Sequence, residues 1–282
     1  MQDIREIRNY MKMSQSQFGS YFGIPLRTVQ NWESNNGSNP PSYIVDMIRR
    51  VVDLEEEVSA DEIKGMIPSL RVNKTNRLDG LTLMATIGDA SISACFLDPQ
   101  YRTILDELSY GNEGDRQRAR CELPQMNDDT IRRFIVEIDR VLKPSAHLFL
   151  WVDKLILCEG KVKEWIQYTD LNLVDMITWD KGRMGMGYRS RSQSEFLIIL
   201  QKSPIRAKDC WRDHAIADVW QERVPKNHPH SKPIELQKRL IIATTQEGDY
   251  VLDPCSGGYS VFEACQALNR EFIGCDIEFG DD

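Results

Sequence analysis

The sequence predicts an α/β protein: a mostly parallel, Rossmann-like sheet with helices on both faces, preceded by a small all-α module. Three observations predict this fold class. Apolar runs of strand length alternate with amphipathic helical stretches from about residue 73 onward. Near the C-terminus, a strand, a glycine-rich turn, a helix and a strand ending in an acidic residue follow one another, as in nucleotide-binding βαβ units. The first 55 residues contain only helical patterns.

The composition is that of a globular protein. Of 282 residues, 41% are hydrophobic and 28% are charged, and no apolar run approaches the ~20 residues needed to cross a bilayer. Seven cysteines without a Cys-x-x-Cys pair predict reduced thiols and no metal site. With no apolar signal core at the start, we expect a cytoplasmic protein without a membrane partner. The net charge of −8 argues against non-specific coating of nucleic acid, although a local basic surface remains compatible with it.

Residues 1–55 are predicted to form four short helices. Ser14 caps the second helix, with Gln17 as its capping-box partner. Gly23-Ile24-Pro25 forms a turn, and a third helix follows over residues 26–33. A helix, a tight glycine turn and a polar second helix are typical of a helix-turn-helix.

The run Ser-Gln-x-x-Phe-Gly…Gly-Ile-Pro…Thr-Val-x-Asn-Trp-Glu resembles the phage-repressor type of helix-turn-helix. The resemblance implies that the module binds DNA, and it places near DNA the polar side chains of Gln15, Gln17, Arg27, Thr28, Gln30 and Asn31. Val29 and Trp32 are assigned to packing. Residues 1–50 hold six Lys and Arg against four Asp and Glu, a weak positive charge. A module used for dimerisation or docking is therefore the alternative.

An acidic and polar linker is predicted over residues 56–72, so the second domain spans residues 73–282. Its expected elements, in order, are a helical stretch through Leu83 and Ile87, a strand over 92–97, a polar segment over 110–125, a helix from Asp128, a strand over 147–152, a helix at about 158–168, strands over 174–179 and 196–200, an irregular segment over 202–227, a helix from Pro233, a strand over 250–252, a helix through Ala267 and a strand over 272–275.

Two motifs lie at the ends of predicted strands. The strand over 92–97 ends in Asp98-Pro99-Gln100-Tyr101, where proline forces a turn. Ligands bind at the carboxyl ends of strands in open α/β sheets. The second motif is Asp253-Pro254-Cys255-Ser256-Gly257-Gly258-Tyr259, and Asp276 follows Gly257 by 276 − 257 = 19 residues. An acidic residue at that distance can accept ribose hydroxyls.

Asp-Pro-Gln-Tyr resembles the Asp-Pro-Pro-Tyr signature of S-adenosylmethionine-dependent DNA amino-methyltransferases, and its place before the glycine-rich unit resembles their circularly permuted beta class. The resemblance covers about residues 76–278 and implies S-adenosylmethionine as cofactor and double-stranded DNA as partner. It implies catalytic roles for Asp98, Pro99, Gln100 and Tyr101. It implies cofactor contacts from Asp79, Asp98, His228, Lys232, Pro233, Asp253, Cys255, Ser256, Gly257, Gly258 and Asp276. Gln100, Cys255 and Tyr259 depart from the family's usual proline, phenylalanine and glycine.

The predicted function is transfer of a methyl group to the N6 amine of adenine in a flipped-out base. A basic stretch is expected to contact DNA phosphates through Lys181, Arg183, Arg189 and Arg191, and residues 202–227 occupy the target-recognition position of the family. The alternatives are cytosine-N4 methylation, a helix-turn-helix regulator with a non-catalytic methyltransferase-like domain, and an RNA or protein amide methyltransferase. A homodimer and a cognate restriction endonuclease are further expectations from the family.

Overall fold

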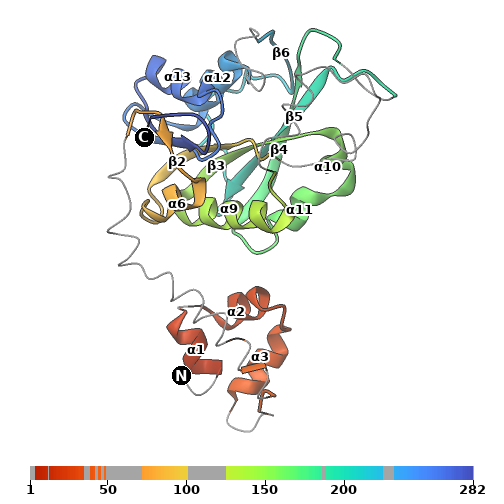
Figure 1. Ribbon diagram of the computed structural model, residues 1–282, viewed down its shortest axis with the longest axis vertical. Coiled ribbons are helices and arrows are strands. Elements are labelled where there is room, and N and C mark those ends of the chain that lie inside the picture. Colours follow the sequence, from red (N-terminus) through yellow and green to blue (C-terminus); the bar gives the residue numbers. More distant parts are fainter. Residues whose placement is uncertain are drawn as a thin grey trace. The chain divides into compact units, whose positions relative to one another are not determined.

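The computed structural model in Figure 1 describes residues 4–11, 13–34, 39–41, 44–45, 48, 72–100, 125–185, 189–224 and 232–281. The chain divides into an N-terminal unit, Met1–Pro68, and a C-terminal unit, Ser69–Asp282. This division falls inside the stretch predicted as a linker. Among the described residues, no helix is both long and apolar enough to cross a membrane.

The N-terminal unit contains the helices α1 (Ile4–Tyr10), α2 (Gln15–Tyr21) and α3 (Leu26–Glu33). Gly23 adopts a φ of +65° in the turn between α2 and α3, a conformation that favours glycine. Gly19 is required by close packing, because a Cβ there would lie 2.6 Å from the carbonyl oxygen of Ile24. The buried core of the unit consists of Ile4, Ile7, Phe18, Val29, Val45 and Ile48, with Trp32 packed against it.

The C-terminal unit is built on one eight-stranded sheet in the order β1-β8-β7-β2-β3-β5-β4-β6. All strand pairs are parallel except the two that β5 makes with β3 and β4. The strands are β1 (Asn76–Arg77), β2 (Ile92–Leu97), β3 (Leu142–Val152), β4 (Leu171–Asp180), β5 (Ser194–Lys202), β6 (Val219–Gln221), β7 (Tyr250–Asp253) and β8 (Glu271–Asp276). The mostly parallel sheet predicted from the sequence is confirmed.

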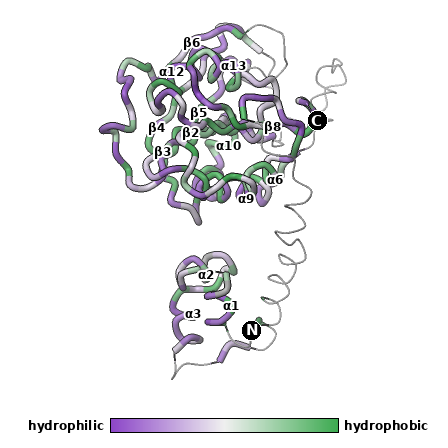
Figure 2. Tube along the Cα trace, turned by 90° about the vertical axis from the view of Figure 1, so that its left-hand side faces the viewer, coloured by the Kyte–Doolittle hydropathy of each residue, from purple (hydrophilic) through white to green (hydrophobic). Residues whose placement is uncertain are grey.

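Helices cover both faces of this sheet (Figure 1). One buried cluster joins strand residues such as Cys95 and Leu97 to α6 (Gly80–Ala85), α9 (Asp128–Val141), α10 (Lys154–Glu159) and α11 (Lys161–Trp165). The other joins Ala94 and Phe96 to α12 (Ile234–Thr244) and α13 (Ser260–Ala267). Successive residues of β2 therefore face opposite layers, and all six are buried, as expected for a central strand. Figure 2 shows the hydrophobic residues gathered in the interior of this unit.

Helix α9 illustrates how the sequence specifies an element. Asn127 caps its N-terminus by accepting the N–H of Thr130 at 2.8 Å. Its buried residues recur three and four positions apart, so they form one apolar stripe against the sheet: Ile131, Phe134, Ile135, Ile138 and Val141. Each such side chain contributes about 1.5–3 kcal/mol when it is fully buried.

Three sequence expectations need correction. The single helix expected at 158–168 is two short helices, α10 and α11, because Gly160 between them has a φ of +73°. The strand expected from residue 147 begins at Leu142, and the pairing of β2 with β3 shifts register across Pro144 and Ser145. The segment over 202–227, expected to be irregular, contains β6, which pairs with the end of β4.

Candidate active site

Three carboxylates follow three neighbouring parallel strands. Asp98 comes directly after β2, Asp253 ends β7 and Asp276 ends β8, with β7 between the other two strands. Because the carboxyl ends of parallel strands meet at one edge of a sheet, the structure brings these predicted site residues together. Burial, with the Asp98 and Asp276 carboxylates nearby, raises the pKa of Asp253 to about 8. Asp253 therefore carries a proton most of the time at neutral pH.

The glycine-rich turn is joined to Asp276. Gly257 has a φ of +48° and donates its N–H to Asp276 Oδ2 at 3.1 Å. The other oxygen, Oδ1, accepts the N–H groups of Glu278 (2.8 Å) and Phe279 (3.0 Å). A carboxylate has about four lone-pair sites, so these three bonds leave about one acceptor site for a ligand hydroxyl.

Close backbone packing holds the turn against β8. A Cβ at Gly274 would lie 2.6 Å from the carbonyl oxygen of Asp253 and 2.7 Å from Ser256 Oγ, so only glycine fits there. The Ser256 hydroxyl donates to that same Asp253 carbonyl at 2.7 Å. Cys255 donates its N–H to Asp253 Oδ1 at 3.3 Å, and burial raises the pKa of its thiol well above the ordinary value. Cys255 is therefore a neutral, partly buried side chain beside the predicted cofactor residues.

Asp79 lies at the start of α6, next to the same turn. A Cβ at Gly80 would lie 2.5 Å from the carbonyl oxygen of Pro254, so α6 begins in contact with the backbone of the motif. The Asp79 carboxylate caps α6 by accepting the N–H of Thr82 at 3.0 Å, and the residue is exposed. It is thus a helix cap with a solvent-facing carboxylate near Pro254.

Tyr259 occupies the position where the resembled family has glycine, and it keeps a glycine-like conformation. Its φ is +56° and its ψ is 32°, a left-handed geometry that costs a non-glycine residue about 1 kcal/mol or more. The phenolic oxygen lies 2.9 Å from the carbonyl oxygens of both Asn76 and Phe279. The ring also packs edge-on against Phe272. These contacts tie α13 to β1 and to the segment whose N–H groups hold Asp276.

Lys232 connects the segment before α12 to the end of β2. Its ammonium lies 2.9 Å from Asp98 Oδ2 and 2.9 Å from Glu195 Oε2, and 5.1 Å from the centre of the Trp151 ring. Only 13% of the side chain is exposed, and the two carboxylates raise its pKa against the opposing effect of burial. Lys232 is therefore a charged, fixed partner of the predicted catalytic carboxylate. Pro233, also predicted, is buried at the start of α12.

The sequence reasoning did not identify Glu195 and Trp151 as site residues. Glu195 lies near the start of β5 and also accepts Lys181 Nζ at 2.5 Å. Its neighbouring lysines lower its pKa to about 2 although burial opposes this. Trp151 lies one residue before the end of β3, the neighbour of β2, and packs edge-on against Trp179. An acidic residue at the start of an apolar strand was the available signal for Glu195.

The basic stretch after β4 is only partly free for phosphate contact. Lys181 is occupied by Glu195, and Arg191 Nε donates to the carbonyl oxygen of Gly185 at 2.6 Å. Arg183 and Arg189 are exposed. The stretch is organised by Asp180, whose carboxylate accepts hydrogen bonds from residues 182, 193 and 221.

Residues 202–224, the described part of the segment over 202–227, are anchored to the same region through Glu222. Its carboxylate accepts the Trp220 indole N–H at 2.8 Å and the N–H groups of Glu235 and Leu236, both at 3.1 Å. Glu222 thereby caps α12, which has no side-chain cap from its own Pro233. The segment predicted to recognise the target and the start of α12, which follows Lys232, are thus both held by the Glu222 carboxylate.

Some predicted site residues lie outside the described part of the chain, namely Tyr101 and His228. Of the motif that contains Tyr101, Pro99 is buried, and the carbonyl oxygen of Gln100 accepts the N–H of Met126 at 2.6 Å. Gly258 is exposed in the glycine-rich turn. Within the described residues, no group of three or more His, Cys, Asp or Glu side chains could hold a metal ion.

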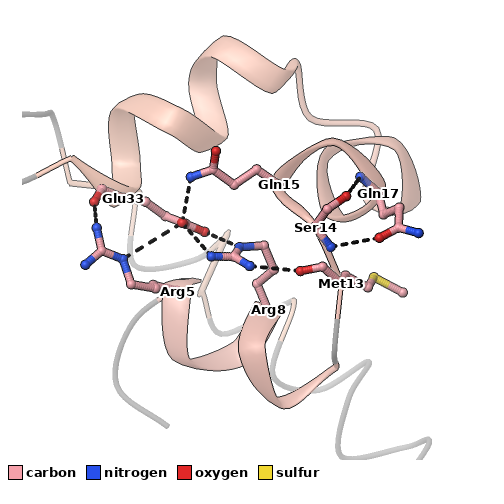
Figure 3. Close-up of polar contacts among 7 residues, drawn as sticks. All are labelled: Arg5, Arg8, Met13, Ser14, Gln15, Gln17 and Glu33. Atoms are coloured by element: carbon pink, nitrogen blue, oxygen red, sulfur yellow. Dashed lines mark hydrogen bonds and ion pairs between the residues drawn. The ribbon is translucent and has the colours of Figure 1, made fainter.

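The N-terminal unit has a buried polar network centred on Glu33 (Figure 3). The Glu33 carboxylate accepts Arg8 Nε at 2.6 Å and Gln15 Nε2 at 2.9 Å, and the pKa of Glu33 is lowered mainly by the Arg8 hydrogen bond. Ser14 and Gln17 exchange capping-box bonds of 2.8 and 3.2 Å, as predicted. Gln15, predicted to lie near DNA, thus has its amide committed to Glu33.

Helix α3 carries an exposed polar stripe. Arg27, Gln30 and Asn31 are exposed at spacings of three and four residues, and the exposed Ser34 follows as the C-cap, whereas Val29 and Glu33 are buried. Thr28, also predicted to lie near DNA, is partly exposed. A stripe of guanidinium and amide groups has the donors and acceptors that read base edges in a major groove.

This fold and site define a doubly wound α/β protein with a ligand site at the carboxyl edge of its sheet. Residues 92–280 match the family described as DNA methylase. The chain belongs to the DNA methylase family.

Curated relatives agree with this assignment. The type II methyltransferase M.HhaII of Haemophilus parahaemolyticus is 57% identical over 214 residues, covering 75% of this chain and 93% of that protein. The type II methyltransferase M.HpaI of Haemophilus parainfluenzae is 48% identical over 226 residues, covering 71% and 68%.

Solved structures show the same fold. The crystal structure of the M1.HpyAVI–SAM complex is 16% identical with a TM-score of 0.51, covering 72% of this chain and 92% of that chain. The cytosine-N4-specific PvuII DNA methyltransferase is 15% identical with a TM-score of 0.55, covering 72% and 83%.

Proposed function

We propose that this protein transfers a methyl group from S-adenosylmethionine to the exocyclic N6 of adenine at a specific DNA site. The observation that carries the proposal is the Asp98 carboxylate, held by Lys232 at the end of β2, two strands away from Asp276. The Asp98 strand precedes the glycine-rich β7–α13–β8 unit in the chain yet lies beside it in the sheet, which supports the circularly permuted arrangement. The type II methyltransferases among the relatives support DNA as the substrate.

The residues at this edge fit S-adenosylmethionine. Asp276 retains an acceptor site for a ribose hydroxyl, and the absence of a side chain at Gly274 lets the glycine-rich turn pack against β8 beside it. Asp79 would contact the adenine ring of the cofactor, as the family resemblance implies. When bound, the cofactor supplies a methyl group that its sulfonium charge already activates.

Asp98 and Pro99 would prepare the target amine. The lone pair of an exocyclic amine is delocalised into its ring, which makes the nitrogen a poor nucleophile. The Asp98 carboxylate and the Pro99 carbonyl would accept its two hydrogens and draw the nitrogen toward tetrahedral geometry. Removing one placed group of this kind typically costs a factor of about 10²–10³ in rate. Lys232 pairs with this carboxylate at 2.9 Å and helps to orient it.

The DNA contacts are proposed from exposure and charge. The base must leave the duplex, since its amine is unreachable in the stack. Arg183 and Arg189 would bind phosphate, and the α3 stripe of the N-terminal unit would read bases as the second helix of a helix-turn-helix. An aspartate at the first motif position favours adenine over cytosine. The type II methyltransferases among the relatives support a cognate restriction endonuclease and a cytoplasmic location as further parts of the proposal.

Nucleoside analysis tests the proposal. Purified protein is incubated with methyl-labelled S-adenosylmethionine and mixed-sequence duplex DNA, and the digested DNA is examined by mass spectrometry. We expect labelled N6-methyladenine. Labelled N4-methylcytosine would overturn the choice of base. Cofactor binding and DNA binding without any labelled nucleoside would overturn the enzymatic function in favour of a regulator.

A further inference from the structure

Glu195 joins the proposed catalytic carboxylate to the basic stretch after β4. Its Oε2 accepts Lys232 Nζ at 2.9 Å, and its Oε1 accepts Lys181 Nζ at 2.5 Å. Lys232 in turn contacts Asp98 Oδ2 at 2.9 Å. Four side chains of alternating charge, Lys181, Glu195, Lys232 and Asp98, thus form one continuous series with no net charge.

The position of the Lys232 ammonium is set by three groups. Asp98 and Glu195 lie on two sides at equal distances, and the Trp151 ring faces it at 5.1 Å. An ammonium is a point charge on a flexible stem, so it takes its place from its partners. If Glu195 lost its charge, the ammonium would lose one of these partners, and its place against Asp98 would change.

We propose that Glu195 is a positioning residue for methyl transfer, acting through Lys232 to hold Asp98 in the orientation that accepts a hydrogen of the target amine. The proposal rests on the function proposed above. Glu195 does not touch the reacting atoms. It shares Lys232 with Asp98, and its second oxygen links this arrangement to Lys181, which stands at the start of the stretch expected to meet DNA.

The test compares Glu195→Gln and Glu195→Asp with a matched control, Glu137→Gln. Glu137 on α9 also binds a cation through two hydrogen bonds from Arg140, and its side chain is similarly exposed (32% against 28%). Methyl transfer to duplex DNA is measured under saturating conditions, with KM for the cofactor and the melting temperature.

For Glu195→Gln we expect kcat at least about tenfold lower and KM for the cofactor within about twofold of wild type. Glu195→Asp should recover part of kcat, and Glu137→Gln should match wild type. Wild-type kcat in Glu195→Gln, or a loss of kcat with no recovery in Glu195→Asp, would overturn the proposal. If Glu195→Gln does not fold, a folded Glu195→Asp decides: reduced kcat supports the proposal and wild-type kcat refutes it. A wild-type protein that methylates no DNA would instead refute the proposed function.

Discussion

Replacing Lys232 with methionine tests the electrostatic support of the site. The substitution keeps an unbranched side chain of similar length and removes the ammonium that lies 2.9 Å from both Asp98 and Glu195. Two partly buried carboxylates then lose their shared partner. Breaking a buried ion pair by removing one partner costs about 3–5 kcal/mol. We expect the free energy of unfolding to fall by that amount at pH 7.

The pKa of Glu195 predicts how this loss of stability changes with pH. The pKa of Glu195 is lowered from 4.5 to about 2, so the stabilisation is complete above pH 4.5 and is lost as the pH falls toward 2. A shift of that size corresponds to about 3 kcal/mol, shared between Lys232 and Lys181. In Lys232→Met the pKa of Glu195 rises toward its ordinary value. The difference in stability between wild type and variant should therefore shrink as the pH falls from 4.5 toward 2.

Urea unfolding of both proteins at several pH values measures this difference. Lys238→Met is the matched control, because Lys238 contacts Glu235 at 2.8 Å on the surface of α12, where a pair contributes only about 0.3–0.5 kcal/mol. A loss below about 1 kcal/mol at pH 7, or a difference that does not change with pH, would refute the reasoning.

Three further predictions concern other parts of the molecule. Tyr259→Phe should raise the dissociation constant of the cofactor about 3–10-fold with kcat retained, because the phenol anchors the segment that orients Asp276. Titration calorimetry measures the dissociation constant, and an unchanged value would contradict the prediction. Asp253→Asn should raise the melting temperature at pH 8, by about 2–4 °C for each kcal/mol by which the free energy of unfolding increases. The reason is that the raised pKa of Asp253 makes the wild type lose stability as the pH rises from 3.8 toward 8. The gain should vanish near pH 4, and a gain in melting temperature that persists at pH 4 would contradict this prediction. Glu33→Gln should lower the urea midpoint of the N-terminal unit alone, because Arg8 is left without its charged partner. Urea unfolding of the full chain, followed by circular dichroism, should show the first transition at a lower urea concentration. An equal shift of the transitions of both units would argue against this prediction.

The sequence predicted the sheet because its strands are short apolar runs that end at recognisable residues. The order of motifs placed Asp98 and Asp276 at strand ends, and the parallel sheet brought both to one edge. The split at Gly160 and the early start of β3 were not predicted, because both depend on single residues with positive φ, Gly160 and Ser145. The periodicity of apolar residues over a stretch of sequence does not indicate which single residue adopts a positive φ.

The charged series around Lys232 could not be predicted from spacing. Glu195 and Lys232 are 37 residues apart, and their contact depends on β5 and the start of α12 reaching the same edge of the sheet. The sequence likewise showed Tyr259 only as a departure from the glycine usual in the resembled family. The structure shows that the tyrosine keeps the left-handed conformation and places its hydroxyl 2.9 Å from two backbone carbonyl oxygens. Local sequence does not show what a side chain meets across the fold.

The central claim is that Asp98 accepts a hydrogen of the target amine at the carboxyl edge of the sheet. Single-turnover methyl transfer by Asp98→Asn tests it most directly, with cofactor and DNA affinities measured on the same preparation. We expect the transfer rate to fall by a factor of about 10²–10³ while both ligands still bind. A variant that transfers methyl groups at the wild-type rate would contradict the claim and would place the chemistry elsewhere in the molecule.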